Sequence, residues 1–212
     1  MASAGALTSC ASVGSVKHRN QERIQDPMAK LFFRYAAMNA GKSTALLQVA
    51  HNYEERGHRV RLYTAAVDDR YGHGRVTSRL GPQRAALEFT PATDFLAEHE
   101  ADEGVACVLI DEAQFLSKTQ VWALHEMAHL RHVPVICYGL RTDFQGELFP
   151  GSAALLGLAD EMDEMRTICD CGRRATINMR VDENNHKFTE GEQVEIGGNA
   201  RYRAVCGRCF RG

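Results

Sequence analysis

The amino-acid sequence predicts an α/β protein whose parallel sheet is covered by helices on both faces. Three observations lead to this fold class. Apolar, strand-like runs alternate with segments of helical character between residues 30 and 139. Each run is apolar at successive positions, which is typical of strands buried on both faces of a parallel sheet. The sequence after Cys169 is polar and spaced by glycines, so we expect a second, smaller domain there.

The first three elements form a strand, a helix and a second strand. Residues 30–36 (KLFFRYA) are apolar enough for a buried strand, and residues 42–56 carry apolar side chains at helical spacing. Gly57 is suited to end this helix, because glycine readily adopts the left-handed conformation found at helix ends. Residues 59–65 (RVRLYTA) are then predicted to form the second strand.

A second group of elements follows at residues 105–139. Residues 105–110 (VACVLI) and 133–139 (VPVICYG) are apolar runs and are predicted to be strands. Residues 117–132 between them have the period of an amphipathic helix, with Ser117 as its N-cap and Trp122 in the core. Both strands contain a cysteine, and we expect Cys107 and Cys137 to be buried and chemically inert.

The chain is expected to divide into three parts. Residues 1–27 show no hydrophobic period and are predicted to be a disordered tail or an upstream extension. Residues 28–165 would form the main α/β domain, and residues 166–212 the small cysteine-containing domain. Within the main domain, residues 67–83 are rich in glycine, aspartate and arginine and are predicted to be a mobile surface loop.

Composition argues against two classes of function. The chain has 25 lysine and arginine residues against 27 aspartate and glutamate residues, so no large electrostatic field is available to hold a nucleic-acid backbone or an anionic membrane. No stretch approaches the roughly 18 apolar residues that a membrane-spanning helix needs. Residues 1–27 lack the apolar centre of a signal peptide. We therefore expect a cytoplasmic protein that binds neither nucleic acid nor membrane.

The segment AAMNAGKST lies between a strand and a helix, which is the context of a phosphate-binding P-loop. Lys42 would reach the β- and γ-phosphates, and the Ser43 hydroxyl would be a ligand of Mg²⁺. Ala36 stands where the usual first glycine would be, five positions before Gly41. The expected nucleotide contacts in this loop are Ala37, Met38, Asn39, Ala40, Gly41, Lys42, Ser43 and Thr44.

Two carboxylates follow the strand at residues 105–110. Because open α/β sheets bind ligands where their strands end, Asp111 is placed to hold Mg²⁺ together with Ser43. Glu112 would orient water in an ATPase, or would accept a substrate hydroxyl proton in a small-molecule kinase, and the motif alone does not choose between them. Arg70 is either an additional cation at the phosphates or an exposed arginine. The nucleotide contacts extend to Asp111, Glu112, Ala113 and Gln114.

Four of the seven cysteines form two close pairs. Cys206 and Cys209 have the two-residue spacing of a zinc knuckle, whereas Cys169 and Cys171 are separated by a single residue. In a reducing compartment such pairs indicate a metal site, and a structural Zn²⁺ would close the long loop between them. A redox pair and unrelated free thiols are the alternatives.

Taken together, these motifs resemble the type II thymidine kinase family in its bacterial form. The resemblance runs from Met28 to Cys209 and includes the segments AAMNAGKST, DEAQF, YGLRTDFQGELFPGS and IGGNARY as well as the paired cysteines. It implies a P-loop α/β domain followed by a zinc domain whose long loop, the lasso, closes over the nucleoside. It also implies ATP with Mg²⁺ and thymidine as ligands, and a homotetramer.

The resemblance further implies which residues form the site. Glu112 matches the carboxylate that accepts the proton of the 5′-hydroxyl. The zinc ligands would be Cys169, Cys171, Cys206 and Cys209, and Ser43 and Asp111 would hold Mg²⁺ with ATP. The residues expected around the thymine and in the lasso are Phe115, Phe144, Phe149, Gly197, Gly198, Asn199 and Tyr202.

The expected activity is therefore ATP-dependent phosphorylation of the 5′-hydroxyl of thymidine, which yields thymidine monophosphate for DNA synthesis. A nucleic-acid-stimulated P-loop ATPase is the first alternative, because Asp-Glu-Ala-Gln after a strand also suits such motors. A zinc-containing binding module with a degenerate nucleotide site is the second.

Overall fold

A six-stranded, all-parallel sheet forms the centre of the protein. The computed structural model describes residues 29–68, 72–102, 104–184, 186–188, 190–191, 193 and 201–212. The strand order is β5-β2-β6-β7-β1-β8, and every neighbouring pair is parallel. The strands are β1 (Leu31–Ala36), β2 (Arg59–Ala65), β5 (Leu87–Phe89), β6 (Val105–Ile110), β7 (Val135–Leu140) and β8 (Glu161–Glu164).

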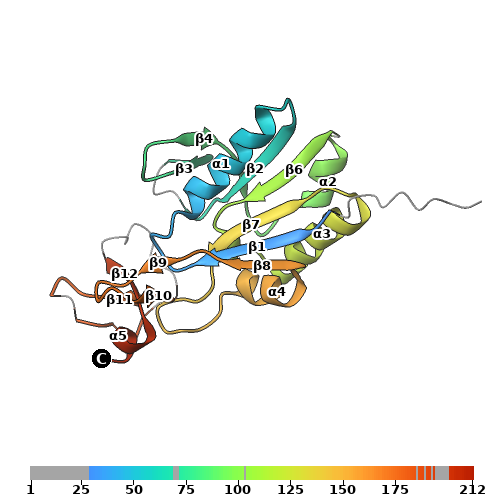
Figure 1. Cartoon of the computed structure of the whole chain (residues 1–212). Helices are drawn as coiled ribbons and strands as arrows, with labels where there is room; N and C mark the ends of the chain where they lie inside the picture. The colour runs from blue at the N-terminus through green and yellow to red at the C-terminus, as the bar shows by residue number, and fades with distance from the viewer. Residues whose placement is uncertain are drawn as a thin grey trace, which may run out of the picture.

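Helices cover both faces of this sheet (Figure 1). One face packs against α1 (Lys42–Glu54), whose buried residues join a cluster with Leu109 and Tyr138 of the central strands. The other face packs against α2 (Phe95–Glu100), α3 (Lys118–Leu130) and α4 (Pro150–Leu158). The predicted α/β class, with a parallel sheet between two helical layers, is confirmed.

Several element limits agree with the sequence prediction, and the differences have local causes. The observed β2 and β6 have the predicted limits. Helix α1 ends two residues before the predicted Arg56, because Gly57 has a φ of 76° and the amide of His58 bonds back to the carbonyl of Tyr53 at 3.1 Å. Strand β7 begins after Pro134, which has no amide hydrogen to donate to a neighbouring strand.

Ser117 is the N-cap of α3, as predicted, and its hydroxyl accepts a hydrogen bond from the amide of Gln120 at 3.1 Å. The helix ends at Leu130, shortly before His132, which has a φ of 57°. The prediction for Trp122 was wrong, because its side chain is 50% exposed and lies edge-on to His125. Trp122 lies on the outer face of α3. The helical period of the sequence does not distinguish an aromatic residue on this face from one in the core.

Part of the predicted surface loop at residues 67–83 is regular structure. Strands β3 (Arg75–Thr77) and β4 (Gln83–Ala85) form an antiparallel hairpin beside α1. Val76 is buried in the cluster with α1, and the amide of Ser78 donates to the carbonyl of Pro82 at 2.8 Å. The hairpin was missed because each of its strands has only three residues, too few for a period.

The C-terminal residues form short strands of their own, beyond the carboxyl ends of β1 and β7 (Figure 1). They are β9 (Thr167–Ile168), β10 (Arg174–Ala175), β11 (Ile177–Arg180) and β12 (Tyr202–Val205), followed by helix α5 (Gly207–Arg211). Their small core contains Cys169, Ala175, Val205 and Cys206. The division of the chain near residue 166 stays a prediction; it would fall between β8 and β9.

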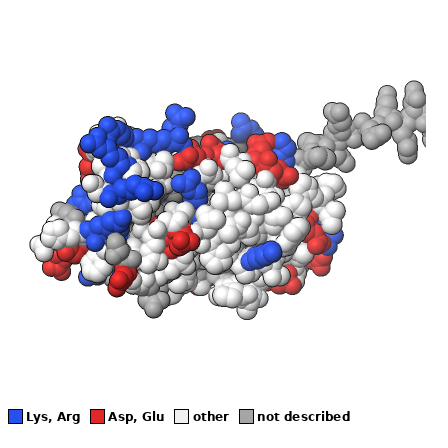
Figure 2. Space-filling view, turned by 90° about the horizontal axis from the view of Figure 1, so that it is seen from below, with Lys and Arg blue, Asp and Glu red and all other residues white. Residues whose placement is uncertain are grey.

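The surface is unevenly charged in the view of Figure 2. Lysine and arginine side chains gather over the C-terminal part of the molecule, with acidic side chains among them, whereas the surface beside α4 is mostly uncharged. Among the described residues, no helix has the length and apolar character needed to cross a membrane.

Candidate active site

The loop between β1 and α1 has the backbone of a phosphate-binding loop. Asn39 and Gly41 have positive φ values of 63° and 79°, so the chain turns sharply before the helix. Ala36 is the last residue of β1 and has no positive φ, which explains why alanine is tolerated where a glycine is usual. The Lys42 side chain is buried beneath the loop, and its Nζ donates to the carbonyl of Ala37 at 3.3 Å.

A residue from the C-terminal part of the chain holds this loop. The amide of Met38 donates to Oδ1 of Asn178 at 2.7 Å, and Nδ2 of Asn178 lies 3.5 Å from the carbonyl of Thr142. Asn178 is on β11 and only 3% exposed. The loop after β1 is therefore braced by a strand that comes much later in the chain.

Asp111 lies directly beside the first turn of α1. Its Oδ2 accepts a hydrogen bond from the Ser43 hydroxyl at 2.9 Å, and its side chain is buried. Burial and the neighbouring Glu112 carboxylate raise the pKa of Asp111 to about 7, while Ser43 and Lys42 act in the opposite direction. A carboxyl group in this environment gains from a nearby cation, and its oxygen together with that of Ser43 suits Mg²⁺.

Glu112 occupies an unusual backbone conformation at the end of β6. Its φ is 53°, in the left-handed region, which costs a residue with a side chain about 1–3 kcal/mol and is often found at functional sites. Nε2 of Gln114 donates to the Glu112 carboxylate, and Oε1 of Gln114 accepts from the amide of Leu140 at 3.0 Å. Gln114 thus fixes the direction of Glu112 relative to the end of β7.

Two glycines make room for this arrangement. A Cβ at Gly139 would lie 2.9 Å from Oε1 of Gln114 and 3.1 Å from its backbone nitrogen. At Gly151 a Cβ would lie 2.4 Å from the carbonyl oxygen of Ala113, so α4 can approach the 3₁₀ turn η1 (Ala113–Phe115) only without a side chain there. Both glycines are consequently needed for the position of the segment after β6.

One cavity of about 480 Å³ joins these groups to a set of aromatic side chains. Its phosphate-loop side is formed by residues 38–44, and Glu112 and Gln114 also line it. Ala37, Asp111 and Ala113, which were also expected to contact nucleotide, are not on the cavity wall but adjoin residues that are. The other described residues on its wall are Val67, Asp68, Thr77, Ser78, Arg79, Leu80, Phe115, Leu140, Asp143, Phe144, Phe149, Asn178, Gln193 and Tyr202.

The aromatic wall is built from three parts of the chain. Phe115 and Phe149 meet edge to face, with ring centroids 6.0 Å apart. The guanidinium of Arg180 lies 5.2 Å from the ring of Phe144 and 5.8 Å from that of Tyr202. Arg180 therefore joins the ring of Phe144 to the ring of Tyr202 on β12. The aromatic rings give the cavity an apolar side, opposite its polar phosphate-loop side.

Asp143 connects the loop after β7 to the segment that precedes β12. Its Oδ1 accepts from the amides of Gln145 and Glu147, both at 2.9 Å. Its Oδ2 accepts from Nε2 of Gln193, also at 2.9 Å. Gln193 is close in sequence to the residues expected in the lasso. Those residues, Gly197, Gly198 and Asn199, lie outside the described part of the structure, as does Arg70.

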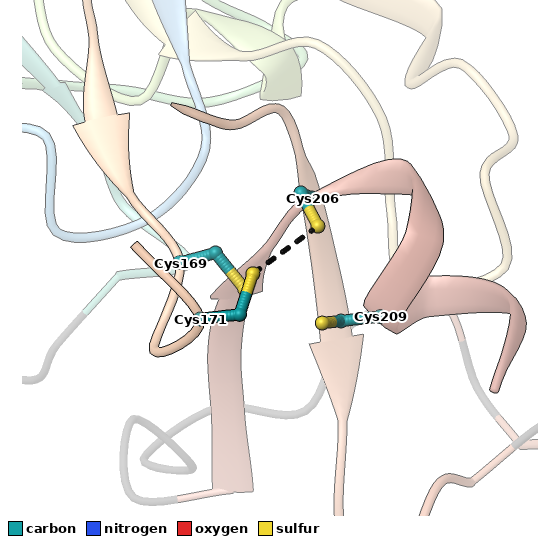
Figure 3. Close-up of side chains that lie close together, drawn as sticks. All are labelled: Cys169, Cys171, Cys206 and Cys209. Atoms are coloured by element: carbon teal, nitrogen blue, oxygen red, sulfur yellow. Dashed lines mark hydrogen bonds between the residues drawn. The ribbon is translucent and has the colours of Figure 1, made fainter. Parts of the chain in front are cut away.

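The two cysteine pairs come together at the C-terminal end of the molecule. Figure 3 shows Cys169 and Cys171, from the turn between β9 and β10, directed toward Cys206 and Cys209 at the start of α5. Their four sulfur atoms all lie within 4.8 Å of one another. The turn is closed by a hydrogen bond from the amide of Gly172 to the carbonyl of Cys169 at 2.8 Å, so the short spacing still allows both sulfurs to converge.

The geometry fits a tetrahedral metal ion better than disulfides. Four sulfurs at about 2.3 Å from Zn²⁺ would be roughly 3.8 Å apart, whereas a disulfide needs about 2.05 Å. The sulfurs of Cys171 and Cys206 are 3.6 Å apart. The backbone amide of Cys209 lowers the pKa of Cys206 to about 6, whereas hydrogen bonds among the thiols raise the pKa of Cys209 to about 12.

Comparison with known proteins decides the family. A family model described as thymidine kinase matches residues 29–210. The chain belongs to the thymidine kinase family. A thymidine kinase of Chromobacterium violaceum is 62% identical over 183 residues, covering 86% of this chain and 98% of that protein. One of Idiomarina loihiensis is 57% identical over 182 residues, covering 84% and 94%. One of Ruegeria pomeroyi is 56% identical over 187 residues, covering 87% and 94%.

Membership of the thymidine kinase family confirms the resemblance drawn from the motifs. Several residues around the site were nevertheless not assigned a role from the sequence, although Gly139, Asp143 and Gly151 lie in the quoted segment YGLRTDFQGELFPGS. A lone asparagine, aspartate or glutamine in a polar stretch is usually a surface residue, so only the fold indicates what these side chains contact. The site residues found only in the structure are Gly139, Asp143, Gly151, Asn178, Arg180 and Gln193.

Proposed function

We propose that this thymidine kinase family member transfers the γ-phosphoryl group of ATP to the 5′-hydroxyl of thymidine. The observation that carries the proposal is the single cavity that is lined by the phosphate loop at one side and by aromatic rings at the other. A donor phosphate chain fits the first side, and a planar, neutral base fits the second.

The phosphate loop supplies the positive charge that the donor needs. The start of α1 directs backbone amides toward an anion, and Lys42 adds a cation beneath them. Ser43 and Asp111, joined at 2.9 Å, are the residues that would hold Mg²⁺. When bound, Mg²⁺ neutralises charge on the phosphate oxygens. The amides of residues 37–44 and the Lys42 cation keep the donor in line with the acceptor.

Glu112 is proposed to accept the proton of the thymidine 5′-hydroxyl as its oxygen attacks the γ-phosphorus. The Glu112 side chain lines the cavity, and the hydrogen bond from Gln114 holds one carboxylate oxygen. Positioning of the hydroxyl supplies most of the rate enhancement in this kind of reaction, and proton transfer supplies part of it.

The acceptor is proposed to lie among Phe115, Phe144, Phe149 and Tyr202. These rings line the cavity and offer apolar faces to a planar pyrimidine base. Gly197, Gly198 and Asn199 are proposed to close over the nucleoside from the lasso, as expected from the sequence. Such closure would exclude water from the γ-phosphate and limit hydrolysis.

The four cysteines are proposed to bind one structural Zn²⁺. The sulfur positions support this role. Because four thiolates would fill the tetrahedral coordination of Zn²⁺, no coordination position would be left for a reacting water. Assembly as a homotetramer and a cytoplasmic location belong to the same proposal. Light scattering after size-exclusion chromatography measures the first.

The test is a comparison of acceptors with purified protein, ATP and Mg²⁺. ADP formation is measured without acceptor, with thymidine, with each of the other deoxynucleosides and with single-stranded DNA. Thymidine should stimulate ADP formation, and thymidine monophosphate should appear in equal amount. Stimulation by DNA alone would favour the nucleic-acid-stimulated ATPase instead. Nucleotide binding without turnover of any acceptor would favour the binding module.

A further inference from the structure

The cavity wall carries two basic side chains among the residues that the structure describes, Lys42 and Arg79. Lys42 belongs to the phosphate loop and is accounted for by it. Arg79 lies in the turn between β3 and β4, outside every motif considered in the sequence. A cation on the wall of a nucleotide-sized cavity, separate from the phosphate loop, needs an explanation of its own.

The turn that carries Arg79 is fixed to the phosphate loop. The hydroxyls of Ser78 and Thr44 are 2.6 Å apart, and Thr44 directly follows the proposed Mg²⁺ ligand Ser43. Ser78 is buried, and its Oγ also accepts from the amide of Leu80 at 3.1 Å. A further hydrogen bond, from the amide of Gly81 to the carbonyl of Ser78 at 3.0 Å, closes the turn. Arg79 directly follows Ser78, which contacts the first turn of α1, so the backbone of Arg79 is held in place.

The Arg79 side chain is exposed and forms no hydrogen bond or ion pair with any residue in the described part of the chain. The arginines nearby behave differently: Arg75 on the same hairpin bonds to Gln83, and Arg84 pairs with Glu54. An arginine that has a fixed backbone, faces a cavity and has no acceptor among the described residues is suited to an anionic ligand. Its planar guanidinium can donate two parallel hydrogen bonds to phosphate oxygens.

We propose that Arg79 binds the phosphate chain of the nucleotide donor. Arg79 approaches the phosphates from the β3–β4 hairpin, whereas Lys42 approaches them from the phosphate loop. The inference rests on the proposed function, because it assigns a residue to the donor part of the same site. Arg79 contributes to the affinity for the donor, and the β3–β4 hairpin is consequently part of the nucleotide site. Lys42 acts as a point charge, whereas Arg79 adds directional hydrogen bonds to the same chain of phosphates.

The decisive variants are Arg79→Ala and Arg75→Ala, each compared with the unchanged protein. Both remove one positive charge from the same hairpin, but Arg75 does not line the cavity. Isothermal titration calorimetry with Mg²⁺–ATP, Mg²⁺–ADP and Mg²⁺–tripolyphosphate measures binding without any acceptor. Tripolyphosphate is included because it has the phosphate chain without the base or sugar.

Arg79→Ala should raise the dissociation constants for ATP and tripolyphosphate by about ten- to a hundredfold, the range expected for loss of charge-assisted hydrogen bonds. Arg75→Ala should change them by less than about twofold, as expected for an exposed charge. Arg79→Lys should lie between Arg79→Ala and the unchanged protein. In kinetics, Arg79→Ala should raise the KM for ATP and leave the KM for thymidine unaltered.

Equal dissociation constants for Arg79→Ala and Arg75→Ala would overturn the inference, as would an effect on ATP that is absent with tripolyphosphate. Circular dichroism and thermal unfolding check that both variants keep the fold. The inference is separable from the proposed function. If the unchanged protein bound ATP but did not phosphorylate thymidine, the acceptor assignment would fail, while the calorimetry would still decide the role of Arg79.

Discussion

Single residues at the end of β6 determine how the carboxylates are presented. Glu112 has a positive φ, Asp111 bonds to Ser43, and Gln114 holds Glu112. The sequence identified Asp111 and Glu112 because they follow a continuous apolar run, but it contained no sign of the left-handed conformation. That conformation depends on the packing of η1 against α4 and β7, which is a property of the fold.

Glu112→Gln tests the proposed base with little change of shape. The amide cannot accept the hydroxyl proton, so kcat should fall by about 10²- to 10⁴-fold. The dissociation constant for Mg²⁺–ATP should stay within about twofold, because the phosphate contacts remain. Stopped assays for thymidine monophosphate and calorimetry for ATP measure the two quantities. Near-normal turnover would contradict the assignment, and Glu183→Gln, at an exposed position, is the control for the substitution itself.

Gly139→Ala tests the support for Gln114. The new methyl group would lie 2.9 Å from Oε1 of Gln114, so this side chain should shift and lose its hold on Glu112. We expect kcat to fall about ten- to a hundredfold, because small misplacements of catalytic groups have effects of this size. Gly157→Ala is the matched control: its Cβ meets nothing within 4 Å. Equal kcat values for the two variants would show that the position of Gln114 is unimportant.

At the scale of elements, long and buried helices and strands could be predicted from the sequence, whereas short or exposed ones could not. Strand β6 has the predicted limits because its six apolar residues are bounded by Gly104 and Asp111, and β2 also has the limits predicted from its β-branched and aromatic residues. Strand β8, with the sequence EMDE, was not predicted, because an exposed edge strand has neither an apolar run nor an alternating pattern. Its position is set by pairing with β1. The hairpin of β3 and β4 was missed for a related reason.

The element whose role is least visible in the sequence is β11, which supplies Asn178 to the phosphate loop. Asn178→Ala removes the acceptor for the Met38 amide and should allow the loop to leave its binding conformation. Loss of a hydrogen bond of about 1 kcal/mol corresponds to a roughly fivefold rise in the dissociation constant for ATP. Asn184→Ala, a similar change at an exposed turn, should have no effect on ATP affinity. Unaltered affinity in both variants would exclude a bracing role.

At the scale of the whole molecule, the described residues of the C-terminal strands form a small core of their own. Cys169, Ala175, Val205 and Cys206 are its buried residues. A core of this size stabilises a fold weakly, so a bound metal ion would supply a large share of the folding free energy of the C-terminal strands. The phosphate loop and the carboxylates could be recognised in the sequence because each is contiguous. The aromatic residues were expected only from the family resemblance. Their ties through Arg180 and Gln193 could not be predicted, because they join segments that are distant in the chain.

Removal of zinc with a chelator should therefore act first on the C-terminal strands. Hydrogen–deuterium exchange should rise in β9, β10, β11 and β12, while β1, β6 and β7 stay protected. ATP affinity should fall at the same time, because Asn178 would no longer hold Met38. Addition of Zn²⁺ should restore both. Unchanged exchange in the C-terminal strands, with zinc removal verified by metal analysis, would mean that these strands fold without it.

The hydrogen bond between Met38 and Asn178 also has a consequence for how the protein is made. The two residues are 140 positions apart, so a ribosome completes the phosphate loop long before it synthesises the asparagine that holds it. A nascent chain that ends before β11 has the whole nucleotide motif but lacks this brace. The nascent chain should therefore reach its full affinity for ATP only after Asn178 has emerged, and fragments that end before β11 should bind nucleotide at least about fivefold more weakly than the whole chain.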